Sequence, residues 1–483
     1  MAITPGAQTR AASVKTALSG NYLDIQSDGW AKQYLPDLIE AEAEVFGKRT
    51  ISGFLSQVGA EEAMAADQVI WSEQGRLHLS YKGTVGTHTT STIEIDTDID
   101  GIDAGTNHGV RVGDTVLVAS NNKTVQCYVS MINANTAGAQ QTTATAFITA
   151  VPYSHEHLDN AGFGTDDAVT VLVYGSEYSK GVAGKVGSNE PSFTTFTNKP
   201  IIMKDMYQVS GSDVSQIGWV EVTGEDGQNG YMWYLKAEGD TRSRFADYTE
   251  MAMIESEKAA AASIVNGSAT GTDDKGGTEG LFAAIEARGH QTSGVSGVNA
   301  ATDLAEFDAI LAEFDKNGAI EENMMFVNRA TSLAMDDMLA SMNSYGAGGT
   351  SYGVFNNSED MALNLGFSGF RRGSYDFYKT DWKYLNDLST RGGINARNVA
   401  GAIRGVIIPA GTSSVYDESL GKNLTRPFLH VRYRASATES RKMKTWITGS
   451  VGAVTSDLDA MTVNFLTERC LVVQGANNFM LMN

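Results

Sequence analysis

The last forty residues have the most continuous apolar pattern of the chain. Arg441–Thr448 reads as a strand, a Gly-containing turn follows, and Leu458–Cys470 and Leu471–Met482 are long apolar segments, the second of them a strand. Free chain ends are usually polar and frayed. We therefore expect this part of the chain to be buried in a core or an interface.

A strongly β-like region covers residues 84–176. Short runs of β-branched and aromatic residues alternate there with Gly and Asn turns, a pattern typical of small barrels. We expect a self-contained, barrel-like insertion at this place. Just before it, the alternation of Leu77, Leu79 and Tyr81 with polar neighbours predicts a hairpin over residues 68–83. The predicted strands of the insertion are Thr92–Asp96, Val110–Ala119, Val125–Ile132, Thr145–Val151 and Ala168–Tyr174.

Residues 231–265 have the pattern of one long helix, because apolar residues recur there every three positions. The alanine-rich end of this segment, Lys258–Asn266, has high helix propensity, and Gly267 ends it. Such a helix would be about 40–50 Å long and would form a spine. The residues that we expect on its buried face are Phe245, Tyr248, Met251 and Ile254.

Shorter elements are predicted on both sides of this helix. Residues 1–33 read as an extended arm, which short helices over Pro36–Phe46 and Ile51–Val58 follow. After the long helix, an amphipathic helix begins at Thr302 and ends at Gly318. Its inward residues are expected to be Leu304, Phe307, Leu311 and Phe314.

The next predicted elements are a short buried strand, Met324–Val327, and a helix over Arg329–Met342. Asn328 can cap this helix, because its side-chain oxygen can accept a hydrogen bond from a backbone N–H of the first turn. The inward residues of the helix are expected to be Ala330, Leu333 and Leu339.

Composition places the chain among large globular proteins. It has 483 residues, 42% of them hydrophobic, and no apolar run long enough to span a membrane. The net charge is −21, whereas a protein that grips nucleic acid directly normally has a basic face. Solubility explains this acidity, and so does a surface that lies beside packed nucleic acid without binding it. No secretory signal is visible, and the two cysteines, Cys127 and Cys470, indicate a reducing compartment.

Two short motifs contain metal-binding residue types. Asp96–Asp100 has the spacing of the first half of a calcium loop, but Asn107 stands where that loop needs a bidentate Glu. His155–His157 places two imidazoles on one face of an extended segment, whereas a closed zinc site needs two more ligands. An acidic strand end and a surface loop are the simpler interpretations, so we assign no metal site.

Candidate catalytic motifs are weak as well. The Gly-rich stretches 271–280 and 346–353 lack the Gly-Lys-Ser/Thr of a phosphate loop. Ser413 and Ser414 do not stand in a Gly-x-Ser-x-Gly elbow. We therefore assign no catalytic residue and no cofactor, and we expect no enzyme. The apolar chain end fits a building block better than an enzyme with a solvent-filled cleft.

The order of the elements resembles that of the major capsid proteins of tailed bacteriophages, which have the Hong Kong 97 fold. An arm and an extended hairpin come first, and the long helix ends at Asn266-Gly267, shortly before Gly280-Leu281. Strand 324–327 and Asn328-Arg329 then open the next helix, as in the central domain of that family. Phe367–Tyr378 is similar to its small loop and strand. The apolar segments Phe465–Cys470 and Leu471–Met482 are similar to its closing elements.

The resemblance implies an α+β chain with an N-terminal arm, an extended β-hairpin loop, a long spine helix and a central α/β domain. The β-rich insertion departs from the minimal pattern, but members of the family often insert a small domain in this loop. The expected parts are an arm with short helices (1–67), the extended loop with the insertion (68–210), a peripheral domain with the spine (211–320), an axial domain (321–435) and a return to the peripheral domain (436–483).

The resemblance also implies a function. Copies would assemble, in the cytoplasm of the host bacterium, into hexamers and pentamers of an icosahedral virion head. The head would enclose double-stranded DNA, which the chain meets only by non-specific proximity. Portal, scaffold and cement proteins are the expected partners, and no membrane is involved. The candidates for contacts between subunits are Lys180, Lys185, Arg371, Arg372, Arg432 and Arg434.

Three other functions stay open at this point. An encapsulin-like compartment shares the fold but packages protein cargo. An extracellular β-rich adhesion or binding protein would use the insertion, although the missing signal and the alanine-rich helix disfavour it. A hydrolase within a multidomain chain would form at most a small oligomer.

Overall fold

The computed structural model describes residues 53–75, 80–99, 101, 103–104, 108–121, 123–132, 147–185, 193–215, 222–223, 229–230, 233–261, 263, 265, 275–318, 320–344, 368–395, 402–417, 422–452 and 454–483. The expected arm and the helix Pro36–Phe46 lie outside these residues. The chain forms two compact units, one made of residues 68–198 and one made of the segments on either side.

The smaller unit begins and ends with a two-stranded antiparallel ribbon. Strand β2 (Val69–Gln74) pairs with β9 (Phe193–Asn198), and the Trp71 ring lies 6.1 Å from that of Phe196. The hairpin expected over residues 68–83 is therefore wrong, because the partner of β2 is more than a hundred residues away. Alternation along a strand shows which face is buried but does not show which strand pairs with it.

Between the two strands of the ribbon, the chain forms a closed six-stranded barrel. All neighbouring strands are antiparallel. The interior is filled by small and branched side chains, among them Val116, Val118, Cys127 and Val129, all fully buried. The strands, in their order around the barrel, are β3 (Ser80–Val85), β4 (Thr92–Asp98), β7 (Phe147–Pro152), β6 (Lys123–Ile132), β5 (Asp114–Ser120) and β8 (Ala168–Ser176).

The strand predicted over Val110–Ala119 starts later, at Asp114, because a tight turn precedes it. Gly113 has a φ of 92°, and the Asp114 carboxylate accepts a hydrogen bond of 2.9 Å from the backbone N–H of Arg111. The Arg111 guanidinium in turn donates to the carbonyl oxygen of His108 at 2.8 Å. These local bonds replace the ladder bonds that a strand would need.

The larger unit contains a five-stranded sheet built around one long strand. β22 (Ala460–Val473) pairs along ten residues with β10 (Ile201–Ser210) on one side. On its other side lie β20 (Leu429–Arg434) and β21 (Lys444–Gly449), both antiparallel to it. β1 (Ala60–Met64) adds a parallel edge to β20. Because β10 pairs along its whole length with β22, residues 201–210 belong to the larger unit.

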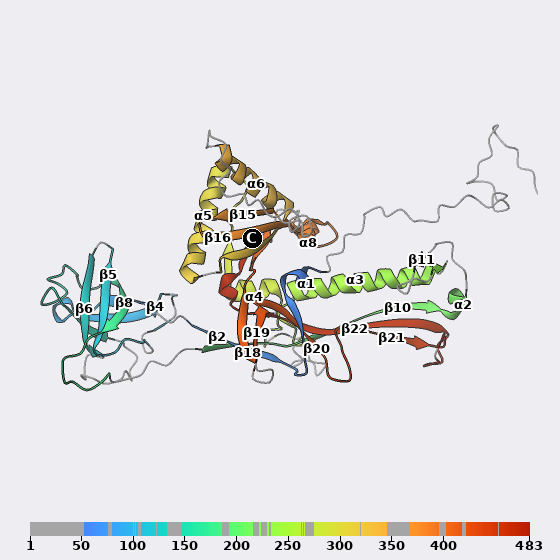
Figure 1. The fold of residues 1–483 in the computed structure, drawn as a ribbon, viewed down its shortest axis with the longest axis horizontal. Helices are drawn as coiled ribbons and strands as arrows, with labels where there is room; N and C mark the ends of the chain where they lie inside the picture. The colour runs from blue at the N-terminus through green and yellow to red at the C-terminus, as the bar shows by residue number, and fades with distance from the viewer. Residues whose placement is uncertain are drawn as a thin grey trace, which may run out of the picture. The chain divides into compact units, whose positions relative to one another are not determined.

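Helix α3 (Trp233–Glu255) lies along β10 and β22, as Figure 1 shows. The Phe245 ring lies 6.0 Å from that of Phe465 on β22. The buried positions of the helix are spaced by four residues instead of three, so Tyr248 is 48% exposed and was wrongly expected on the buried face. The buried stripe consists of Thr241, Phe245, Thr249 and Met253, and Ile254, expected on the buried face, is buried beside it.

The long helix ends at Glu255, earlier than its alanine content predicts. The backbone N–H of Gly280 donates to the Ser256 carbonyl oxygen at 2.7 Å, and that of Ala259 donates to Gly276 at 2.9 Å. Gly277 has a φ of 68°, and a Cβ on it would lie 2.3 Å from a backbone oxygen of Glu257. Pairing with this Gly-rich return segment therefore outweighs the helix propensity of the alanines.

A second sheet of six strands forms the centre of the larger unit. Helices α5 (Ala300–Asn317) and α6 (Arg329–Ser344) contribute to the same core as its strands, with Phe307 and Met338 fully buried. The strands, in order, are β13 (His290–Thr292), β23 (Met480–Met482), β17 (Gly405–Pro409), β14 (Glu322–Val327), β16 (Tyr375–Asp381) and β15 (Ser368–Arg372).

Both helices begin at an asparagine cap. Asn299 accepts a hydrogen bond from the Thr302 N–H at 2.9 Å, and Asn328 accepts one from the Thr331 N–H at 2.8 Å. The inward face expected for α6 is partly wrong, because Ala330 and Leu333 are exposed. The side chains that face the core are instead one position further along the chain, and they include Thr331, Ala334, Met335 and Met338.

The closing segment is buried, but its strands are not separated at Cys470, where the prediction placed the boundary. β22 runs without a break from Ala460 to Val473, a 3-10 turn follows, and β23 joins the central sheet. Arg404 donates to the backbone oxygen of Asn483 at 3.2 Å. The other α-helices and strands among the described residues are α1 (Phe54–Val58), α2 (Gly211–Val214), β11 (Val222–Thr223), β12 (Asn229–Gly230), α4 (Leu281–Arg288), α8 (Lys383–Asn386), α9 (Arg391–Asn395), β18 (Thr412–Asp417) and β19 (Lys422–Pro427).

Candidate functional sites

An ion-pair network covers the junction of β1, β20 and β22. The parallel register of β1 and β20 places Glu62 beside Arg432, and their side chains are 2.8 Å apart. On β22, Glu468 accepts from Arg441 at 2.5 Å. Arg434 pairs with Asp67. Arg432 and Arg434, two positions apart on β20, thus meet carboxylates from the early part of the chain, whereas Arg441 meets one from β22.

Arg469 lies at the centre of this network and is only 8% exposed. Its guanidinium lies 3.5 Å from Glu61 and donates to the Lys442 carbonyl oxygen at 2.7 Å. Burial lowers the pKa of Arg469, and Glu61 and Glu250 oppose that shift. Such a buried cation is tolerated only because these acceptors surround it.

Glu250 of α3 contributes to the same cluster. Its two carboxylate oxygens accept from the backbone N–H groups of Gly53 at 3.1 Å and Leu55 at 3.2 Å, so they cap the short helix α1. Burial raises the pKa of this carboxyl group, and the two backbone hydrogen bonds counteract the shift. The network therefore ties α1 and α3 to the sheet. Sequence reasoning missed it, although an isolated Glu-Arg pair in an apolar strand, Glu468-Arg469, was the available signal.

Five of the six predicted contact residues have an acidic partner within the chain. Besides Arg432 and Arg434, Lys185 lies 2.5 Å from Asp114. Arg371 lies 3.5 Å from Asp376. Arg372 makes two hydrogen bonds, of 2.5 and 2.6 Å, to Asp308. Lys180 lies in the exposed segment after β8. The role of these six residues between subunits stays a prediction.

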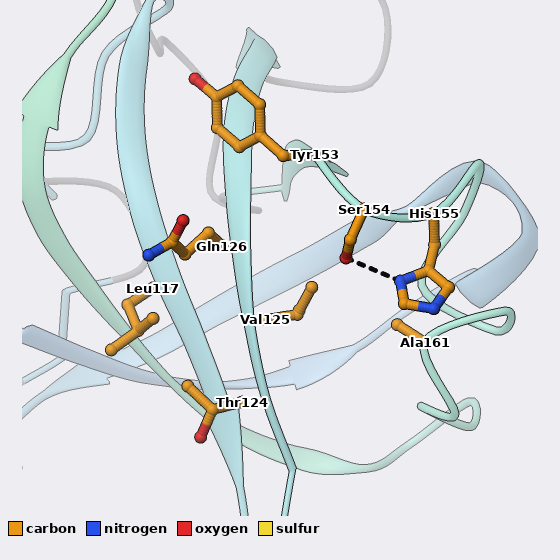
Figure 2. A pocket seen from close by; sticks show the side chains of 8 residues that line it. All are labelled: Leu117, Thr124, Val125, Gln126, Tyr153, Ser154, His155 and Ala161. Atoms are coloured by element: carbon orange, nitrogen blue, oxygen red, sulfur yellow. Dashed lines mark hydrogen bonds between the residues drawn. The ribbon is translucent and has the colours of Figure 1, made fainter.

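One outer face of the barrel has an open depression of about 390 Å³, which Tyr153 lines. Figure 2 shows the residues that line it, including Leu117, Gln126 and Tyr153. Tyr153 is 51% exposed, and its hydroxyl donates to Glu177 at 2.5 Å. That hydrogen bond is the main cause that raises the pKa of Tyr153 to about 12, so the phenol is neutral at physiological pH.

The two candidate metal motifs lie on the same unit and do not assemble a ligand set among the described residues. His155 Nδ1 lies 2.8 Å from the Ser154 hydroxyl, and His157 lies 3.9 Å from Glu156. Asp96 lies on β4. Asp100 and Asn107, the other positions of the calcium spacing, fall outside the residues described. In the described part of the chain, no three His, Cys, Asp or Glu side chains form a group that could hold a metal.

The nucleophile candidates offer no activated group in the described part of the chain. Cys127 and Cys470 are free and buried, and burial raises the pKa of each thiol to about 12. Ser413 and Ser414 lie on β18. The Gly-rich stretch 346–353 falls outside the described residues. Among the helices that the structure describes, none is both long and apolar enough to cross a bilayer.

Comparison with known proteins finds similarity only at the level of structure. No protein family and no curated protein matches the sequence. A structure from Gordonia phage Cozz covers 98% of this chain and 98% of its own, with 10% identity and a TM-score of 0.41. One from Microbacterium phage Oxtober96 covers 95% and 99%, with 8% identity and a TM-score of 0.38. The capsid structure of cyanophage P-SCSP1u covers 64% and 80%, with 10% identity and a TM-score of 0.33.

These similar structures come from phages, and that of cyanophage P-SCSP1u is a capsid structure. All three TM-scores are below 0.5, so the structures superpose only in part. The details of this chain are therefore argued from its own residues and contacts.

Proposed function

We propose that the chain is the major capsid protein of a tailed bacteriophage and that its copies form the hexamers and pentamers of an icosahedral head around double-stranded DNA. It acts as a structural protein and not as an enzyme. The observation that carries the proposal is the pairing of β10 with β22 beneath α3. The long helix α3 packs on β22, which is paired with a strand on each of its edges, and we call this stiff unit the wedge. A shell subunit needs such rigidity, whereas an enzyme needs a cleft.

Exposed apolar side chains on this wedge support assembly. Along β10, alternate residues point away from α3, and Ile202 and Met206 on that face are 54% and 59% exposed. On the other side of β22, Ile447 of β21 is 52% exposed as well. Large apolar side chains on a chain of net charge −21 are best explained by a covering partner. Neighbouring copies of the same chain are that partner, through contacts that propagate a lattice.

The predicted parts of the chain are assigned on the same basis. Residues 1–67 act as the arm and 68–210 as the extended loop with its inserted barrel, although β10 at the end of that range pairs within the larger unit. Residues 211–320 and 436–483 act as the peripheral domain, and 321–435 as the axial domain. The contact candidates, from Lys180 to Arg434, meet acidic surfaces of adjacent copies. Portal and scaffold proteins take part in assembly in the host cytoplasm, and a cement protein joins the finished virion. DNA is enclosed without specific contacts, as the acidity of the chain requires.

Electron microscopy and gel filtration of the expressed full chain test the proposal. We expect closed shells or capsomers of many copies, after addition of a scaffold protein if the chain alone does not assemble. Nuclease-protected DNA in particles from infected cells distinguishes a virion from a compartment that packages an enzyme. Discrete oligomers below a few hundred kilodaltons under assembly conditions would overturn the proposal.

A further inference from the structure

The outer face of the barrel over β8, β5, β6 and β7 is built by strand register. Leu172 pairs with Leu117, Leu117 pairs with Gln126, and Tyr128 pairs with Val151. The residues between them along each strand, such as Val116 and Cys127, fill the barrel core. The paired residues therefore point outward together. We call this surface, with Tyr153 and Tyr174, the tyrosine face.

Tyr174 stands at an irregularity of the ladder. Val173 pairs with Val116 and Gly175 pairs with Thr115, so Tyr174 is the extra residue of a bulge on β8. Bulges re-aim side chains and are frequent next to binding sites. Tyr174 is 52% exposed. It also lies close enough to Tyr153, as does Tyr128, for the charges of both phenols to raise the pKa of Tyr153. Three tyrosines thus share one face.

The polar groups of the face are suited to hydroxyl-rich ligands. Gln126 offers an amide that both donates and accepts, and Thr124 and Ser154 offer hydroxyls around the depression (Figure 2). Tyr153 is held in place by Glu177, so its ring is presented with little loss of freedom on binding. The volume of about 390 Å³ lies within the usual range of ligand pockets.

Charge selects among the ligand classes. Residues 68–198 contain six Lys and Arg against thirteen Asp and Glu, a net charge of −7. A polyanion such as nucleic acid or an acidic polysaccharide would be repelled. A protein partner would be expected to bind a more apolar surface than the tyrosine face, which combines aromatic rings with hydroxyl groups and an amide. A chain of neutral sugars fits best, because its pyranose rings have apolar C–H faces and edges of hydroxyl groups.

We infer that the tyrosine face binds a neutral polysaccharide, with Tyr153 and Tyr174 against the faces of pyranose rings and Gln126 hydrogen-bonded to their hydroxyls. The binding belongs to the single chain and does not depend on shell formation. A shell would add avidity, because many weak sites would engage one polymer at once.

Affinity electrophoresis of the full chain tests the inference. Native gels contain dextran, mannan or a β-glucan as neutral polymers, and polygalacturonate as the acidic one. We expect at least one neutral polymer to retard the chain and polygalacturonate to have no effect. Tyr174→Ala should weaken the interaction about 3- to 10-fold, the size of a lost aromatic contact, and Gln126→Ala should weaken it as well. Tyr174→Phe should retain it, because the ring remains.

Tyr248→Ala is the matched control, because Tyr248 is similarly exposed but lies on α3 of the other unit. Thermal unfolding verifies that each variant is folded. Absence of retardation by every neutral polymer would overturn the inference, and so would equal losses in Tyr174→Ala and Tyr248→Ala. A change in oligomeric mass with Tyr174→Ala, without any change in polymer binding, would assign the face to contacts between copies instead.

Discussion

Arg469 on the long strand β22 lies 3.5 Å from Glu61 on the early strand β1, and the two residues are 408 positions apart in sequence. Arg469 is buried and Glu61 is partly exposed, and together with Glu250 they join the five-stranded sheet to α1 and α3. The fold of the larger unit therefore depends on a polar contact in the middle of apolar packing.

Replacement of Arg469 by Met should lower the free energy of unfolding by about 2–3 kcal/mol, because the partly buried Glu61 and Glu250 would lose their shared cation, although Lys442 would still pair with Glu61. Urea denaturation, followed by circular dichroism, measures the loss. Arg371→Met is the control, because Arg371 is 52% exposed beside Asp376 and should matter by less than about 1 kcal/mol. Similar losses in both variants would contradict this account of the network.

Acid should destabilise the barrel through His108. The imidazole is 2% exposed, and neither ring nitrogen has a hydrogen-bond partner among the described residues. Burial, and then the charge of Arg111, lower the pKa of His108 from 6.5 to about 4. The unfolded chain therefore binds the proton more readily, so stability is present at neutral pH and is lost as the pH falls from about 6.5 to 4, by about 3 kcal/mol.

This pH dependence can be removed by mutation. In His108→Phe, which keeps a ring beside Tyr81, the decrease in stability between pH 7 and pH 4 should be about 3 kcal/mol smaller than in the wild type. Hydrogen exchange of the barrel amides at several pH values measures it. His155→Gln is the control, because His155 is exposed and lies in the same unit. An unchanged pH profile in His108→Phe would show that other groups cause the acid sensitivity.

Arg404 should hold the closing strand. Its guanidinium donates to Val295 O at 2.7 Å and to Gly294 O at 2.8 Å, besides the bond to Asn483. Val295 has a φ of 58°, a strained value for a β-branched residue. Arg404→Met should cost about 2–4 kcal/mol and should speed hydrogen exchange in β23. Arg329→Met, at a position that is 68% exposed, should do neither. Slow exchange in the Arg404 variant would mean that apolar burial alone fixes the strand.

The exposed face of β10 should be needed for assembly and not for folding. Met206→Asp places a charge where a neighbouring copy is expected to pack, so the yield of shells or capsomers should fall at least about tenfold while the melting temperature stays nearly constant. Val298→Asp makes the same change at a side chain that is 75% exposed and should assemble normally. Electron microscopy and light scattering compare the two. Normal assembly of Met206→Asp would remove β10 from the contacts between copies.

Local patterns in the sequence predict elements well where the structure is local. The helix that ends at Gly318 is predicted from its apolar stripe and its left-handed C-terminal glycine, whereas its cap, Asn299, lies three residues before the predicted start at Thr302. The strands of the barrel are predicted because runs of β-branched and aromatic residues between turn residues are local patterns too. The partner of β2 and the early end of α3 were missed, because distant segments decide both.

The candidate site was less predictable than the fold. The late cations were visible in the sequence, but their carboxylate partners, such as Glu62 and Asp67, lie more than three hundred residues away. The tyrosine face was missed too, because its three rings come from separate strands and from one bulge. Only the register of the closed barrel brings them together.

The ribbon at the base of the barrel makes the insertion exchangeable. Gln74 and Phe193 are partners at the far end of β2 and β9, so a two-residue turn could replace everything between them without altering the remaining pairs. Because the insertion begins and ends at two adjacent positions of the ribbon, a whole domain can be gained, lost or exchanged there in evolution. The same junction would accept a foreign protein whose termini lie side by side, which makes it a natural position for display.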